Sequence, residues 1–252
     1  MFDHHHIGET TNWGILQYFN VFGIHIPTYS FFVLLGLIVG IYVFWLLGKK
    51  DYAKNENSFY VIFFGILGGT LGAKIPIWIA YFNEIKQSGN IESILSGRTI
   101  TGGLIGGFIA IWITKKILKE KNRFGNAIAP GAAIGIAIGR IGCFLHGCCY
   151  GKPTNLPWGV DFGDHISRHP TQIYEIIYLT ILSIILIRLQ KKKLRPGILF
   201  DYFLIFYFGF RFFIEFIRVE PKVFYSFSLY QVASVFVIIL VIIKINLYKI
   251  KN

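Results

Sequence analysis

The sequence predicts an all-α integral membrane protein, a polytopic helix bundle with about seven transmembrane helices. Composition is the first observation behind this prediction: 54% of the 252 residues are hydrophobic, 17% are aromatic and only 15% are charged, which is too apolar for a soluble domain. The second is that the apolar residues gather in runs close to the roughly 20 residues that cross a bilayer. The third is that short basic clusters follow several of these runs. We expect residues 1–252 to form a single transmembrane domain.

Seven apolar runs are the expected membrane-spanning helices. In chain order they are Tyr29–Leu47, Phe59–Phe82, Gly102–Ile117, Ala127–Leu145, Gln172–Ile187, Gly197–Ile217 and Leu229–Ile243.

Local sequence justifies each span in turn. The first ends at a lysine pair, and the second carries closely spaced glycines that let a partner helix approach. The third opens on Gly102 and Gly103, which either pack closely against a neighbour or let a helix N-terminus meet an anionic headgroup. The fourth is rich in Ala, Gly and Ile, and the fifth follows Pro170 at a helix start. The last two are strongly apolar.

The distribution of lysine and arginine predicts the orientation. Sixteen of the 25 basic residues lie at one set of span ends and six at the other. Because cytoplasmic loops carry the excess of basic residues, segment 1–28 and loop 146–171 should be extracytoplasmic, and the C-terminus cytoplasmic. The same clusters account for the net charge of +12, so we expect no nucleic-acid partner.

Two arginines are expected within the membrane near its outer side. Arg140 lies where a helix of small residues breaks into a glycine-rich turn, and Arg211 begins a stripe with Glu215 and Arg218 at i, i+4 and i+7 of one helix. The planar fork of arginine suits phosphate oxygens. We therefore expect Arg140 and Arg211 to clamp a lipid phosphodiester, with Glu215 positioning one of them. A self-contained ladder of salt bridges is the alternative.

A polar block that runs from Arg168 to Glu175 is predicted at the outer mouth of the fifth span. Its residues His169, Gln172 and Glu175 recur at a spacing of three, although His169 precedes the proline and its side chain can lie outside the helix. We treat these three and Tyr174 as site candidates, with a structural polar rim as the alternative.

The thiols of this chain allow several interpretations. Cys143, Cys148 and Cys149 lie beside His146, but their spacing lacks the separated pairs of ordinary structural zinc sites, so we predict no metal. A thiol nucleophile with His146 as its base is a second interpretation, and packing by small polarizable side chains is a third. The run His4–His6 is expected to be a solvated tail.

Taken together, these segments resemble the prolipoprotein diacylglyceryl transferase family from about Tyr29 to the last span. The family signature reads G-R-x-G-N-F-x-N-G-E-x-x-G. The positions that match it here are Gly139, Arg140, Gly142, Phe144, Gly147 and Gly151. A G-G-L-I-G segment, an R-H-P-x-Q-x-Y-E block and an R-x-x-x-E-F-x-R helix also recur in the family's order. Four matches in order are more specific than any one of them.

The resemblance implies an enzyme of the bacterial inner membrane that transfers the diacylglyceryl group of phosphatidylglycerol to the lipobox cysteine of a prolipoprotein and releases glycerol phosphate. It implies no metal and no organic cofactor; the partners are membrane lipids, phosphatidylglycerol and the lipobox peptide. By position, Arg140 and Arg211 would hold the headgroup, while Glu215 and Arg218 would support them. Tyr29, a candidate interfacial aromatic, and Gly151 would shape the site.

The sequence departs from the family pattern at four positions. Thr101 replaces a histidine before G-G-L-I-G, Cys143 and His146 replace two asparagines, and Cys148 replaces a glutamate. We keep Thr101, the adjacent glycine pair and Cys143 as candidate substrate contacts by position. His146 or His169 could supply the missing base. The departures also leave open transfer to another acceptor, and a lipid-binding or transport protein without catalysis.

Overall fold

The structure is a computed structural model that describes residues 16–21, 24–52, 56–80, 86, 99–120, 124–192, 194–219, 222–224 and 227–251. The helices are α1 (Thr28–Tyr52), α2 (Glu56–Ala80), α5 (Ile100–Ile117), α6 (Gly125–His146), α7 (Thr171–Gln190), α8 (Ile198–Ile214) and α9 (Leu229–Lys251). Three antiparallel hairpins pair β1 (Tyr18–Val21) with β2 (Ile24–Pro27), β3 (Val160–Asp161) with β4 (Ser167–Arg168), and β5 (Lys222–Phe224) with β6 (Phe227–Ser228).

Each predicted span coincides with one helix, which confirms the mostly helical fold. Among the described residues, four stretches are long and apolar enough to cross a membrane: Thr28–Gly48, Gly125–His146, Thr171–Gln190 and Leu229–Tyr248. A shorter apolar stretch covers Phe59–Ile75. Many large apolar side chains on these helices are exposed, as expected for helices surrounded by lipid.

The chain forms two compact units. The smaller contains α2 and α5 within Lys49–Asn122, and the larger contains Asp3–Gly48 and Arg123–Asn252. The larger unit therefore holds the first hairpin, most of α1, and all of α6, α7, α8 and α9.

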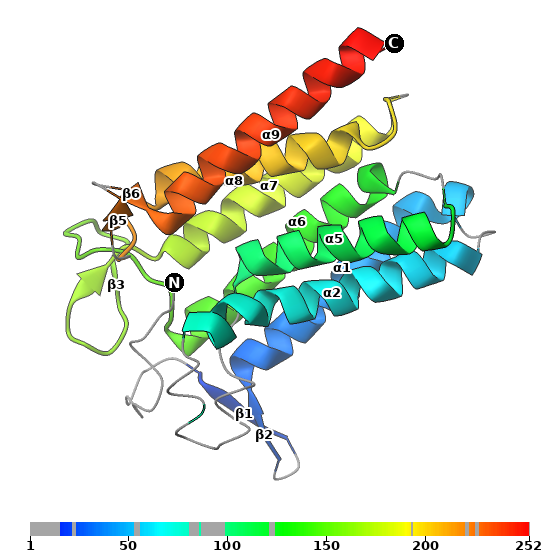
Figure 1. Ribbon diagram of the computed structural model, residues 1–252. Coiled ribbons are helices and arrows are strands. Elements are labelled where there is room, and N and C mark those ends of the chain that lie inside the picture. The colour runs from blue at the N-terminus through cyan, green and yellow to red at the C-terminus, as the bar shows by residue number, and fades with distance from the viewer. Residues whose placement is uncertain are drawn as a thin grey trace. The chain divides into compact units, whose positions relative to one another are not determined.

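Glycines bring α2 and α5 of the smaller unit side by side (Figure 1). A Cβ atom added at Gly72 would lie 2.6 Å from the carbonyl oxygen of Gly102, and one added at Gly103 would lie 3.3 Å from that of Gly69. Any larger side chain would hold the two backbones apart. Close packing, one of the two interpretations of Gly102 and Gly103, is thus confirmed.

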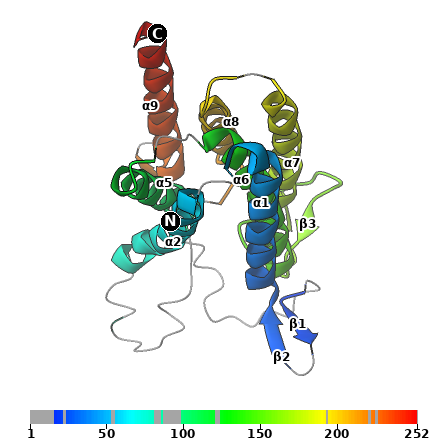
Figure 2. The ribbon, with the colours of Figure 1, turned by 90° about the vertical axis from the view of Figure 1, so that its right-hand side faces the viewer.

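In the larger unit, α6 packs against α7 and α8, and α9 packs against α8 (Figure 2). Ser183 of α7 donates a 3.0 Å hydrogen bond to the carbonyl oxygen of Pro130, inside α6. The side chain of Asn126 fastens the start of α6 to the start of α8, because it accepts from the Leu199 amide at 3.0 Å and donates to the Arg195 carbonyl at 3.1 Å. These bonds fix the helices that carry the conspicuous arginines.

The sequence prediction of one continuous helix through Arg218 is wrong. The helix α8 ends at Ile214, and Arg218 forms an isolated antiparallel bridge with Gly151. The amide of Lys152 donates to the Ile217 carbonyl at 2.7 Å. The backbone after α8 therefore finds its hydrogen-bond partners in the loop that follows α6, which ends the helical stripe before Arg218.

Candidate active site

The end of α6 places Arg140 beside a sharp turn. Gly147 caps the helix in the left-handed region with φ 75°, which a residue without Cβ adopts at little cost. The amide of Cys148 donates to the Cys143 carbonyl at 3.0 Å, and that of Gly147 donates to the Phe144 carbonyl at 3.0 Å. This is the Schellman type of helix ending, and it folds Cys148 back over the last turn of α6.

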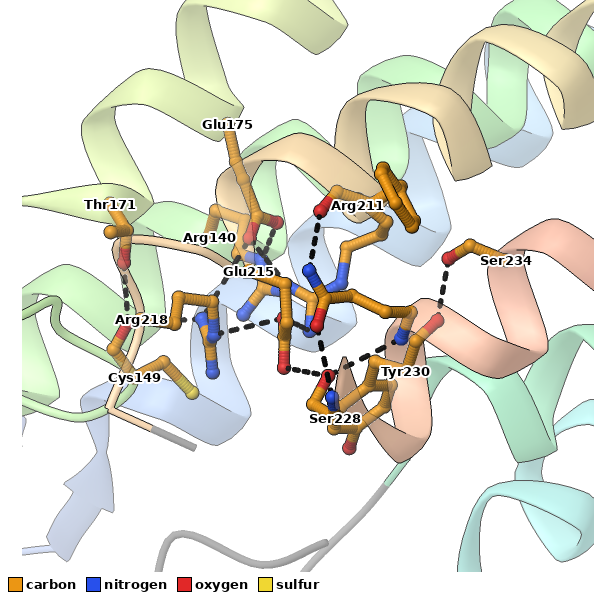
Figure 3. Close-up of polar contacts among 12 residues, drawn as sticks. Arg140, Cys149, Thr171, Glu175, Arg211, Glu215, Arg218, Ser228, Tyr230 and Ser234 are labelled. Carbon is orange, nitrogen blue, oxygen red and sulfur yellow. Dashed lines mark hydrogen bonds and ion pairs between the residues drawn. The ribbon is translucent and has the colours of Figure 1, made fainter. Parts of the chain in front are cut away.

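Glu175, near the start of α7, is a carboxylate shared by three arginines (Figure 3). Its Oε2 atom forms an ion pair with Nε of Arg140. Its Oε1 atom lies 2.9 Å from Nη1 of Arg211 and 3.8 Å from Nη1 of Arg218. Two arginines that are 71 positions apart in the sequence thus meet at one carboxylate.

Glu215 supplies the second carboxylate of the cluster. Its Oε2 atom lies 3.1 Å from Nη2 of Arg211 and 3.7 Å from Nε of Arg218. Its Oε1 atom accepts a 3.1 Å hydrogen bond from the hydroxyl of Ser228, at the start of α9. Glu215 therefore positions Arg211, as the i, i+4 spacing predicts.

We call Arg140, Glu175, Arg211, Glu215 and Arg218 the arginine cluster. Each of the five residues is at most 6% exposed. Three guanidinium groups against two carboxylates leave one excess positive charge, and burying an uncompensated charge is costly. The ladder of salt bridges expected as the alternative is therefore not electrically complete within these five residues. A group with one negative charge would complement the cluster.

The loop after α6 is fastened to α7 and to Arg218. The Cys149 carbonyl accepts hydrogen bonds from Thr171 Oγ1 at 2.6 Å and from Arg218 Nη1 at 3.0 Å. Gln172 Nε2 donates to the Cys148 carbonyl at 2.6 Å. Cys149 itself is held in the left-handed region with φ 67°, an unfavourable conformation that these bonds maintain.

Gly151 lets three segments meet beside the arginine cluster. A Cβ atom at this position would lie 2.8 Å from the Ile217 carbonyl oxygen, 2.8 Å from the Cβ of His169 and 2.9 Å from the Cγ2 of Thr171. Its amide donates to the His169 carbonyl at 2.9 Å. The absence of a side chain is what permits the bridge to Arg218.

The three thiols converge next to the cluster. The sulfur atoms of Cys143, Cys148 and Cys149 all lie within 4.8 Å of one another, and Nη1 of Arg140 lies 3.7 Å from the Cys143 sulfur. The pKa of the Cys149 thiol is well below its ordinary value, because hydrogen bonds with the other two thiols, and then the charges of Arg218 and Arg140, favour the thiolate, although burial opposes it. A thiolate at Cys149 is one anion that would compensate the excess positive charge of the arginine cluster.

The two histidines that were candidate bases occupy different settings. His169 lies outside α7, as expected for a residue before proline, and its Nδ1 atom is 3.3 Å from the Tyr174 hydroxyl, which accepts a 2.8 Å hydrogen bond from Trp158. His146 is the last residue of α6, and its ring lies 6.2 Å from that of Tyr29. Its buried Nδ1 atom has no hydrogen-bond partner among the described residues.

Tyr29 lies beside the end of α6, whereas the candidates of the third span belong to the other compact unit. A Cβ atom on Gly142 would lie 3.2 Å from the Tyr29 backbone, so the start of α1 lies against the end of α6. Thr101, Gly102 and Gly103 belong to α5, in the other compact unit. Their part in the same site stays a prediction.

The last predicted span begins at Leu229, where α9 does begin, but sequence reasoning missed the polar contacts at this helix start. The hydroxyl of Ser228 accepts from the Gln231 amide at 3.3 Å, and the Ser228 amide donates to the Gln231 side chain at 2.9 Å, which is a capping box. Tyr230 presents its ring to the Arg211 guanidinium, 4.8 Å from the ring centroid. The S-x-x-Q pattern before an apolar run could have indicated the capping box, but nothing in it indicates the contact of Ser228 with Glu215.

Comparison with known proteins finds relatives that match nearly the whole chain. A family model described as prolipoprotein diacylglyceryl transferase matches residues 17–247. The Clostridium tetani protein named phosphatidylglycerol–prolipoprotein diacylglyceryl transferase is 34% identical over 241 residues, 91% of this chain and 96% of that relative. The Clostridium perfringens protein named phosphatidylglycerol–prolipoprotein diacylglyceryl transferase 2 is 30% identical over 92% of this chain and 94% of its own length. The Clostridioides difficile protein of that name is 32% identical over 86% and 88%, respectively.

Proposed function

The chain belongs to the prolipoprotein diacylglyceryl transferase family, and from this membership we propose that it transfers the diacylglyceryl group of phosphatidylglycerol to the lipobox cysteine of a prolipoprotein. It is a membrane enzyme of the transferase class. We place it in the bacterial inner membrane as a seven-span protein whose N-terminus and arginine cluster face the outside.

The observation that supports this proposal most is the meeting of Arg140 and Arg211 at Glu175. The cluster holds one positive charge more than its carboxylates neutralise, and a phosphodiester carries one negative charge. Arginine binds phosphate oxygens through two parallel N–H groups. In our proposal the headgroup phosphate of phosphatidylglycerol binds Arg140 and Arg211, and Glu175 and Glu215 hold both guanidinium groups in position.

The transfer requires one bond to form and one to break. The acceptor cysteine, as thiolate, attacks the glyceryl carbon that bears the phosphate, forming a C–S bond while the C–O bond to phosphate breaks. The electron pair of that bond leaves on glycerol phosphate, which gains one negative charge. Preorganised guanidinium groups in a water-poor site stabilise this developing charge, and such electrostatic stabilisation is commonly the largest catalytic contribution. No step needs a metal or an organic cofactor.

A base must take the proton of the acceptor thiol, and His146 and His169 are the candidates. His146 has a buried ring nitrogen without a hydrogen-bond partner among the described residues, whereas Nδ1 of His169 already faces Tyr174. We favour His146 for this reason. The remaining sequence-predicted residues, Gln172, Tyr174 and Gly151, would shape the site around the reacting groups.

The test is an assay of purified protein with phosphatidylglycerol labelled in its diacylglyceryl group and a lipobox peptide. We expect label on the peptide and release of glycerol phosphate. If glycerol phosphate is released at the same rate without the peptide and the diacylglyceryl group appears on another thiol or alcohol, the acceptor is a different one. The changes at Thr101 and Cys148 make this a specific alternative. Headgroup binding without any release would contradict the proposal.

Matched variants locate the chemistry. Arg140→Lys keeps the charge but removes the planar fork, so we expect transfer to fall by at least about 100-fold. Arg188→Lys is the control, because Arg188 is exposed near the other end of α7. His146→Ala and His169→Ala test the base; full activity in both variants would remove both residues from that role.

A further inference from the structure

The chain contains three cysteines, and the structure gathers all of them at one place. Cys143 comes from the last turn of α6, and Cys148 and Cys149 come from the turn after it. All three are reduced thiols, and their sulfur atoms lie within 4.8 Å of one another. The close spacing along the chain argued against an ordinary zinc site, but the helix ending that returns Cys148 to Cys143 brings the sulfurs together.

We propose that Cys143, Cys148 and Cys149 form a binding site for a thiophilic divalent cation of the zinc and cadmium class. Zinc binds thiolates at about 2.3 Å, so three sulfurs in a tetrahedral arrangement lie about 3.8 Å apart. Sulfurs already within 4.8 Å need to approach by at most about 1 Å, which small side-chain rotations provide. Soft thiolate ligands select zinc-like ions over magnesium or calcium.

The charges around the thiols fit an anionic metal complex. Three thiolates and one divalent cation carry a net charge of −1, which matches the excess positive charge of the arginine cluster. Arg140 lies 3.7 Å from the Cys143 sulfur, and Arg218 binds the Cys149 carbonyl. With neutral ligands, a divalent cation here would be repelled by the guanidinium groups. With three thiolates, the complex is negative and is attracted by them.

The backbone that carries the ligands is held in place without a metal. Gln172 and Thr171 bind the carbonyl groups of Cys148 and Cys149 at 2.6 Å each. The fourth position of a tetrahedral complex is left to water or another small ligand.

This inference goes beyond the proposed transfer reaction and is measured by metal binding. The metal complex and the headgroup phosphate would use the same excess positive charge, so bound metal should inhibit transfer. The experiment titrates cadmium into the reduced, full-length protein in detergent. His4, His5 and His6, which lie outside the described residues, are replaced by alanine so that their imidazoles do not contribute. We expect one cadmium ion per chain, with an ultraviolet sulfur-to-cadmium charge-transfer band whose intensity corresponds to three thiolates. Zinc should displace the cadmium and magnesium should not.

Single variants assign the ligands. Cys143→Ser, Cys148→Ser and Cys149→Ser should each weaken cadmium binding by more than the roughly 10- to 100-fold that loss of an outer-sphere partner costs. His165→Ala is the control, because this exposed imidazole, 3.7 Å from Asp161 in the same loop, could itself bind metal away from the thiols; the variant should leave the affinity unchanged. A charge-transfer band of undiminished intensity, with unchanged cadmium affinity, in the serine variants would overturn the proposal.

A second measurement needs no variant. Zinc should slow the alkylation of all three thiols in the unmodified protein, while magnesium should leave the rates unchanged. Alkylation rates that do not respond to zinc, or the absence of a charge-transfer band, would also overturn the proposal.

Discussion

At the scale of single residues, Glu175 links groups that the sequence keeps far apart. Arg140 and Arg211 stand out in the sequence because charged residues in apolar helices are costly. The pairing of Glu215 with Arg211 follows from helical spacing. The contact of Glu175 with three arginines does not follow from helical spacing, because it depends on how α6, α7 and α8 pack. Likewise, nothing in the spacing of the cysteines shows that a helix ending folds their sulfurs together.

Replacing Glu175 by glutamine tests its central place. Glu175→Gln leaves three buried guanidinium groups with one carboxylate, and breaking a buried pair typically costs about 3–5 kcal/mol. We expect a large fall in the thermal unfolding temperature in detergent, together with loss of transfer activity. Asp164→Asn is the control, since it also removes a carboxylate from an arginine, Arg168, but in an exposed loop where such pairs are worth about 0–1 kcal/mol. Equal effects of the two variants would contradict the assigned role.

Gly151 offers a second test at this scale. In Gly151→Ala the new Cβ would approach the Ile217 carbonyl and two side chains to within 2.9 Å, so the bridge to Arg218 must shift. We expect destabilisation of about 1–3 kcal/mol, as for other overpacked sites, and reduced transfer. Gly139→Ala should be neutral or stabilising in the same unfolding measurement, because nothing lies within 4 Å of its Cβ position. A Gly151→Ala protein as stable as Gly139→Ala would show that the loop is not tightly constrained.

At the scale of elements, hydrophobic run length locates all seven helices in the described part of the chain, since a bilayer sets the length that each must reach. It fails at the end of α8, where Phe216 and Ile217 continue the apolar pattern although the helix has ended. There the tertiary bridge between Gly151 and Arg218 overrides local preference. The short hairpins have no comparable sequence signal, because two to four residues are too few to show a period.

The capping box of α9 connects an element boundary to the site. Ser228→Ala removes the cap, which costs about 0.5–2 kcal/mol, and also removes the hydrogen bond to Glu215. We therefore expect lower stability and a moderate loss of activity. Ser234→Ala, which removes only a bond to the Tyr230 carbonyl within the same helix, should change neither by much. Both are compared by thermal unfolding and by the transfer assay, and similar losses in the two variants would argue against a link between the α9 start and the site.

At the scale of the whole molecule, the arginine cluster lies near the end of α8, and a second group of ion pairs lies near its start. Asp201, near the start of α8, pairs with Arg195 at 3.1 Å and with Lys244 of α9. Arg211 lies ten residues further along the helix, about 15 Å away. Thus α8 carries two separate groups of ion pairs. The group around Asp201 lies near the end that is predicted to be cytoplasmic, and the arginine cluster lies near the end that is predicted to be outside.

Orientation is the prediction on which substrate access depends, because lipobox cysteines belong to secreted precursors in the proposed function. If the basic ends are cytoplasmic, a fluorescent reporter that folds only in the cytoplasm should be bright when fused after Asn252. A protease site inserted at the exposed Asn155, in the loop between α6 and α7, should be cleaved in cells whose cytoplasmic membrane is intact. The same site inserted at the exposed Lys191, after α7, is the matched control and should be cleaved only once the membrane is opened. The reverse pattern would place the arginine cluster on the cytoplasmic side, out of reach of a secreted acceptor, and would falsify the proposed transfer.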